Sequence, residues 1–193
     1  MSGDSWLQPH LDTVLRKHRS VLSSWRRQLP TLQGRTKNFE TWLVVELVHQ
    51  LLHTGFAQEV RTNGHFAQRK VRAGEVSRLG GSKAKAKYLS ADLSVRLPSS
   101  RRLSAEIKTG LAPKELLNDL RIVRHYNVTG VADRAEFGWV VLLPEAEETR
   151  KSALKTFEKT FAKLASEHKD YRLKRTDVTP WLISCVAVPG RSR

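Results

Sequence analysis

Two stretches of the chain decide the fold: YLSADLSVRL at residues 88–97 and RLSAEIK at residues 102–108. Both alternate polar and apolar residues, which is the period of a β-strand with one buried face. The four residues between them, PSSR at 98–101, are typical of a hairpin connection. The pattern therefore predicts two neighbouring strands that carry three charged residues, Asp92, Glu106 and Lys108.

The placement of these charges suggests chemistry. Side chains alternate between the faces of a strand, so Glu106 and Lys108 project from one face while Ile107 points into the core. The short hairpin can set Asp92 beside Glu106, and buried charges are costly unless they pair or hold a metal. A divalent cation such as Mg²⁺ favours oxygen ligands and relieves the repulsion between two carboxylates.

A metal held in this way can activate water for attack on a phosphate, which indicates hydrolysis of a phosphodiester. Lys108 would position the attacking water or stabilise charge in the transition state. The alternative is a surface hairpin on which Glu106 and Lys108 form an ordinary ion pair on the solvated face.

Working outward from the hairpin, apolar periodicity predicts helices over 10–29, 39–53, 113–126 and 145–168. Further strands are expected over 56–62, 137–144 and 181–188. The order is α-α-β-β-β-α-β-α-β. We expect residues 1–34 to form a helical extension packed on a domain of residues 35–193.

Composition favours an anionic partner. The 193 residues contain 34 Lys and Arg against 19 Asp and Glu, a formal net charge of +15. Nucleic acid is the commonest partner of so basic a chain, and a membrane surface is the weaker interpretation because the bases are spread along the sequence. No apolar run reaches the ~18 residues of a membrane span, and the N-terminus lacks a secretory signal pattern. We therefore expect a cytoplasmic protein with no membrane association.

Two segments are candidates for phosphate contacts. A glycine- and lysine-rich loop contributes Arg78, Lys83, Lys85 and Lys87, and the helix over 113–126 contributes Lys114, Arg121 and Arg124 on roughly one face. Such contacts would position DNA without reading its sequence. The alternative for each segment is a merely solvated loop or helix face.

The spacing from Asp92 to Glu106-Ile107-Lys108 resembles the motif of the PD-(D/E)xK nuclease superfamily, which includes many restriction endonucleases. That family places the Asp in the second and the (D/E)xK in the third strand of an α-β-β-β-α-β core, and residues 39–143 follow this order. The resemblance covers about half of the chain. Ala91 replaces the Pro that precedes the family's Asp, and Ile122 stands four residues before Tyr126 where the exonuclease branch has Gln.

The resemblance implies an α/β (α+β) protein with a restriction-endonuclease-like core, a mixed central sheet flanked by helices, and an extra N-terminal helix. It implies Mg²⁺ or Mn²⁺ as the cofactor, with Asp92, Glu106 and the Ile107 carbonyl as metal ligands and Lys108 serving the nucleophile.

Many members of the family also carry a metal-proximal Glu on the first core helix, and two candidates exist here. At about 100° per residue, Glu40 falls within the apolar arc of that helix and Glu46 on the opposite arc, as a solvent residue would. We favour Glu40 as a fourth catalytic residue. A first-turn acid stabilised by the helix dipole is the alternative for Glu40.

The leading hypothesis from the sequence is a metal-dependent DNA endonuclease. Cleavage of both strands of a duplex usually requires two active sites, so a homodimer is expected, with the apolar face of the helix over 10–29 as a candidate contact. DNA rather than RNA rests on the habit of the family. The alternatives are a non-catalytic nucleic-acid-binding protein that retains the nuclease fold, and an accessory subunit whose partner supplies the chemistry.

Overall fold

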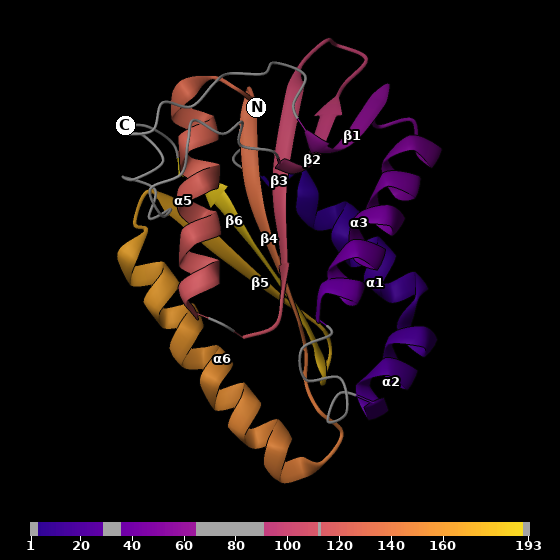
Figure 1. Ribbon diagram of the computed structural model, residues 1–193, viewed down its shortest axis with the longest axis vertical. Helices are drawn as coiled ribbons and strands as arrows, with labels where there is room; N and C mark the ends of the chain where they lie inside the picture. The colour runs from indigo at the N-terminus through magenta and orange to yellow at the C-terminus, as the bar shows by residue number, and fades with distance from the viewer. Residues whose placement is uncertain (1–3, 29–35, 65–90, 112, 191–193) are drawn as a thin grey trace.

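A six-stranded mixed sheet lies between two layers of helices in the computed structural model, which describes residues 4–28, 36–64, 91–111 and 113–190 (Figure 1). One face is covered by α1 (Leu7–Lys17), α2 (Arg19–Gln28) and α3 (Thr36–His53), and the other by α5 (Pro113–Thr129) and α6 (Glu147–Glu167). The strands are β1 (Glu59–Gly64), β2 (Ala91–Arg96), β3 (Arg102–Thr109), β4 (Arg134–Leu142), β5 (Tyr171–Thr179) and β6 (Leu182–Pro189). The predicted mixed α+β class is confirmed.

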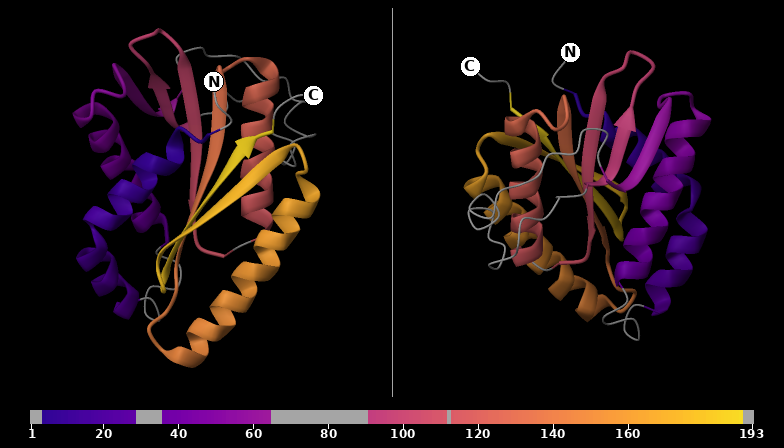
Figure 2. Two further views of the ribbon diagram at one scale, coloured as in Figure 1. Left: turned by 180° about the vertical axis from the view of Figure 1, so that it is seen from behind. Right: turned by 45° about the horizontal axis from the view of Figure 1, so that its top comes forward.

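The strand order across the sheet is β1-β2-β3-β4-β6-β5. β3 and β4 pair in parallel, and α5 makes the crossover between them; the other four neighbouring pairs are antiparallel. The predicted hairpin is confirmed as β2 and β3, in which Leu93 pairs with Ala105 and Arg96 with Arg102. The view from behind and the view with the top tilted forward show the same two helical layers on either side of the twisted sheet (Figure 2).

The N-terminal segment differs from the prediction. Instead of one helix over 10–29, two helices meet at His18, whose backbone leaves the helical region at φ −100° and ψ 19°. The break turns the chain so that Trp25 of α2 packs edge-on against Trp42 and Phe39 of α3, at ring-centroid distances of 5.1 and 5.7 Å. A straight helix would carry these later turns along a single line instead of around the core.

The apolar face of this segment is used inside the chain. Leu11, Val14, Leu15 and Leu22 are at most 1% exposed and belong to the cluster that joins α1 and α3 to the sheet. The expectation that this face supplies a dimer contact is therefore wrong, because packing within the chain already covers it.

Close approach of α1 to the sheet depends on Gly138 in β4. A Cβ atom at this position would lie 3.0 Å from Leu7 Cδ2 and 3.0 Å from Ile107 Cδ1. Almost no side chain can be accommodated at such distances without a shift of its neighbours. The absence of a side chain at Gly138 thus lets the first turn of α1 lie directly on β3 and β4.

The sequence did not predict β5. Its residues are densely charged, with Arg172, Lys174, Arg175 and Asp177, and its burial alternates only weakly. β5 is an edge strand that pairs only with β6 among the described strands, so one side of it needs no apolar partner. Elsewhere the predicted elements are present with shifted ends: α3 begins at Thr36, α5 continues to Thr129 and β4 begins at Arg134.

No helix among the described residues is both long enough and apolar enough to cross a membrane.

Candidate active site

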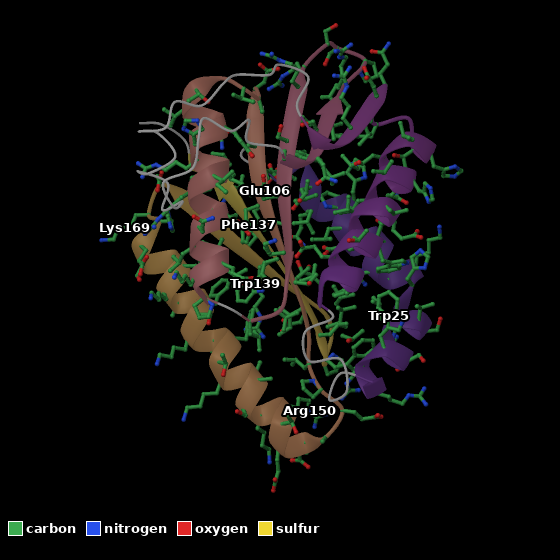
Figure 3. The ribbon with its side chains drawn as sticks, in the orientation of Figure 1. Trp25, Glu106, Phe137, Trp139, Arg150 and Lys169 are labelled. Carbon is green, nitrogen blue, oxygen red and sulfur yellow. The ribbon has the colours of Figure 1, made fainter. Side chains whose placement is uncertain are left out.

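The hairpin of β2 and β3 carries a polar stripe on the face that α5 covers. Most odd-numbered residues of the two strands point to the other face and belong to the core under α1 and α3. They include Leu93, Leu103 and Ile107. The polar stripe on the opposite face consists of Asp92, Ser94, Ser104, Glu106 and Lys108. Glu106 lies on the sheet beside α5 (Figure 3).

Asp92 and Glu106 stand opposite each other across the hairpin. The paired ladder of the hairpin ends at Leu93 and Ala105, and Asp92 and Glu106 are the next residues of the two strands, near enough for Asp92 to raise the pKa of Glu106. The Ile107 backbone N–H donates a hydrogen bond of 2.8 Å to Asp92 Oδ2, which ties the Asp92 side chain to β3. The position of this pair follows from the hairpin alone, because a short turn sets the register.

Glu106 is held in an environment that opposes its negative charge. Its side chain is buried, and its pKa is raised well above the ordinary value, first by burial and then by repulsion from Asp92 and Asp119. A hydrogen bond of 3.0 Å from Tyr126 Oη to Glu106 Oε1 and the nearby Lys108 act in the other direction but do not compensate. A positive charge brought to this position would be strongly favoured.

Lys108 connects the two helical layers. Its Nζ lies 3.0 Å from Glu40 Oε1 on α3 and 3.6 Å from Asp119 Oδ2 on α5. Burial alone would lower the pKa of Lys108, but Asp119 and Glu40 outweigh it and hold the pKa above its ordinary value. Lys108 is therefore a permanent cation at the edge of a carboxylate cluster.

Asp119 also belongs to this carboxylate cluster, although the sequence did not lead us to expect it there. It is 9% exposed, and burial raises the pKa of Asp119 to about 6, against the attraction of Lys108 and with added repulsion from Asp92 and Glu40. A signal was present in the sequence: at 100° per residue Asp119 falls on the buried arc of its helix with Leu116 and Leu120. A carboxylate on an apolar helix face requires a partner, and Lys108 is that partner.

The two candidate glutamates of α3 lie in different places. Glu40 contacts Lys108, whereas Glu46 Oε2 lies 2.9 Å from His18 Nε2, at the junction of α1 with α3. The expectation that Glu46 is a solvent residue is wrong, because its side chain is only 19% exposed and has a partner.

Of the residues predicted to contact phosphates, only those of α5 lie within the described part of the chain. Arg78, Lys83, Lys85 and Lys87 lie outside the described residues. Lys114, Arg121 and Arg124 are all exposed on α5, and Arg124 Nε lies 2.9 Å from Asp170 Oδ2. Arg124 is therefore partly occupied by an acid of its own chain.

The donor chemistry of the cluster fits a divalent cation. Four carboxylates, Glu40, Asp92, Glu106 and Asp119, interact with one another and with Lys108, so negative charge is in excess within the cluster. Carboxylate oxygens are the ligands that Mg²⁺ and Mn²⁺ prefer. No three Asp, Glu, His or Cys residues of the described segments are arranged as a metal-binding group.

Comparisons with known proteins add little to this geometry. No protein-family model and no curated protein matches the chain. A solved structure, "Crystal structure of SSO0001", aligns with 81% of this chain and 85% of that chain at 15% sequence identity and a TM-score of 0.28. A likeness this weak carries no argument about fold or function.

Proposed function

We propose that this protein is a metal-dependent DNA endonuclease with a restriction-endonuclease-like core. The observation that carries the proposal is the juxtaposition of Asp92 and Glu106 across the hairpin, with Lys108 two residues further along the same strand. An ordinary solvated hairpin would leave these charges in water, whereas Glu106 is buried among like charges. The unfavourable environment of Glu106 supports a role in binding a cation.

In this proposal Asp92 and Glu106 hold Mg²⁺ or Mn²⁺, and the resemblance adds the Ile107 carbonyl as a third ligand. The cation, when bound, supplies charge neutralisation at the scissile phosphate and lowers the pKa of water. The Ile107 N–H fixes the Asp92 carboxylate, and Tyr126 Oη fixes the Glu106 carboxylate. These two hydrogen bonds orient the ligands from outside, as the second layer of a metal site does.

Lys108 serves the attacking water and the phosphate. Its ammonium group cannot act as a base, because its raised pKa keeps it protonated. It can hold the water by donating a hydrogen bond and can stabilise the negative charge that develops on phosphate oxygens. Glu40 and Asp119 position Lys108 Nζ from α3 and α5, so both are positioning residues.

Two further features of the proposal concern the partner. The exposed Lys114 and Arg121 of α5 are available to contact DNA phosphates. Cleavage of both strands requires two sites, so the active form is proposed to be a homodimer.

The test compares cleavage of supercoiled and linear DNA in Mg²⁺, in Mn²⁺ and in excess chelator. Glu106→Gln and Lys108→Met are expected to lower the cleavage rate roughly 10²–10³-fold, as loss of a transition-state donor or charge does. Glu40→Gln is expected to lower it less, because Asp119 still holds Lys108. The matched control is Glu46→Gln, which removes the same charge from the same helix outside the cluster and leaves the rate unchanged.

The behaviour of the wild type also distinguishes an enzyme from a non-catalytic nucleic-acid-binding protein. If the wild type shifts DNA on a gel but leaves every substrate intact in both metals, the catalytic proposal fails. A non-catalytic nucleic-acid-binding protein would then be the better description.

A further inference from the structure

α6 carries a row of four lysines that the candidate active site does not use. Lys151, Lys155, Lys159 and Lys163 recur at four-residue steps, and all four are exposed. Residues four apart lie above one another on a helix, so the four ammonium groups form one ridge. With a rise of about 1.5 Å per residue, successive members are about 6 Å apart along the axis, and the ridge is about 18 Å long.

Packing on the opposite side of α6 fixes the orientation of this lysine ridge. Phe157, Thr160 and Leu164 are buried against the sheet, so the lysines face outward. α6 runs along the outer edge of the molecule, on the same side of the sheet as α5 (Figures 1 and 2). Arg150 and Lys169 mark its two ends (Figure 3).

The acids of α6 leave the ridge available. Lys151 pairs with Glu147 and Lys163 with Glu167, but all four side chains are at least 39% exposed, and such exposed pairs are weak. The acid in the middle of the helix, Glu158, is engaged elsewhere. Its Oε1 accepts a hydrogen bond of 2.5 Å from Arg175 Nη1 on β5.

We propose that the lysine ridge binds the backbone phosphates of duplex DNA along one groove edge. The inference rests on the proposed function only for the class of partner, a nucleic acid, and does not depend on cleavage. A duplex presents one negative charge per ~1.7 Å of its axis, so a row of cations that slants along the helix, turning about 40° at each step, can meet several phosphates at once. Lysines serve as point charges there and add affinity without sequence preference.

The surface around the ridge argues against other anionic partners. Between the lysines lie the small or polar Ser152, Thr156 and Ala162, all exposed. The large apolar side chains that are exposed among the described residues are Val21, Val45, Leu52 and Val128, and none lies on α6. Insertion into a membrane surface needs an apolar face, and a protein interface usually has an apolar or aromatic centre.

The experiment measures DNA binding by fluorescence anisotropy over a range of salt concentrations, in excess chelator so that no cleavage occurs. The ridge variant is Lys151→Gln, Lys155→Gln, Lys159→Gln and Lys163→Gln. The matched control removes four exposed positive charges from the other face of the sheet: Arg16→Gln, Lys17→Gln, Arg19→Gln and Arg27→Gln. Both variants change net charge equally, so they separate a located binding surface from general attraction.

The slope of log affinity against log salt changes by about 0.9 for each phosphate that the protein no longer neutralises. The ridge variant is expected to lose about 2–4 units of slope, and the control less than about 1 unit. Equal decreases in the two variants, or an unchanged slope in the ridge variant, would overturn the proposal. Polyglutamate that competes as well as DNA at equal charge would overturn it too, in favour of an acidic protein partner.

Three further measurements keep the outcomes distinct. Thermal unfolding of both variants checks that they fold, since substitutions of exposed side chains usually change stability little. Failure of the wild type to cleave DNA would remove the proposed catalysis but leave the anisotropy test intact. A Glu106→Gln variant whose DNA affinity no longer depends on salt would overturn the proposal, because Glu106 lies outside the lysine ridge.

Discussion

Two buried glutamates on neighbouring strands contrast sharply. Glu106 of β3 and Glu136 of β4 are separated by one step of the parallel register, since Ala105 pairs with Glu136 and Glu106 with Phe137. Their side chains point to opposite faces of the sheet, and both are at most 7% exposed. Burial raises the pKa of each carboxyl.

Their partners are opposite in kind. Glu136 accepts hydrogen bonds from Ser5 Oγ and from the backbone N–H groups of Trp6 and Leu7, and it lies 2.7 Å from Arg134 Nε. All four partners stabilise its negative charge, and the bonds from Ser5, Trp6 and Leu7 also tie the start of α1 to β4. Glu106 has two partners that stabilise its negative charge, Tyr126 and Lys108. The carboxylates of Asp92 and Asp119 repel that charge. The partners of a buried acid, and not its burial, therefore separate a structural role from a candidate functional one.

The strongest test of this contrast is stability. Glu136→Gln is expected to lower the free energy of unfolding by about 3–5 kcal/mol, because it removes a fully buried charge that four donors stabilise and leaves the partly buried Arg134 without its counter-charge. Glu106→Gln is expected to leave it unchanged or to raise it slightly, since repulsion is removed. Urea unfolding in excess chelator measures both. Equal destabilisation at the two positions would contradict the contrast.

Addition of a divalent cation gives the next largest effect. At about 100 times its dissociation constant, Mg²⁺ or Mn²⁺ should stabilise the wild type by about 2.7 kcal/mol, seen as a higher melting temperature. Asp92→Asn is expected to lose this gain, whereas Glu148→Gln, an exposed acid at the start of α6, keeps it. A melting temperature that responds equally in both variants would show that the cation acts on general surface charge.

Removal of the Tyr126 hydroxyl should have a smaller effect. Tyr126→Phe is expected to weaken Mn²⁺ binding about 10–100-fold in calorimetric titration, because it frees the Glu106 carboxylate from its orienting donor. Tyr171→Phe is the matched control: that hydroxyl accepts a 2.8 Å hydrogen bond from Asn127 Nδ2, away from the cluster. Unchanged Mn²⁺ affinity in Tyr126→Phe would count against Glu106 as a ligand.

The smallest effect concerns pH. A carboxyl whose pKa is higher in the folded than in the unfolded chain destabilises the fold once the pH exceeds its unfolded pKa. Without divalent cations, the wild type should therefore lose stability relative to Asp119→Asn, on the order of 1 kcal/mol, as the pH rises from about 4 to about 7. Unfolding at several pH values measures this. A difference that grows toward low pH instead would contradict the raised pKa of Asp119.

The sequence predicted the parts of this contrast that depend on local register. Asp92 and Glu106 belong to one hairpin, so a strand period and a short turn were enough to place them together. Asp119 and Glu136 depend on contacts between segments far apart in the chain, and a periodic pattern carries no information about such partners. The strand β5 was missed for a related reason, since a charged edge strand takes its conformation from β6.

The bonds from Glu136 to the start of α1 also bear on the order of folding. They join residues 129 to 131 positions apart, so the first turn of α1 cannot be completed until β4 exists. At a synthesis rate of roughly 5–20 residues per second, this delay is on the order of ten seconds. During that time Leu7, Leu11 and Leu15 have no sheet to cover them. α1 is thus made well before the strands on which it packs, and its apolar side needs protection from aggregation until then.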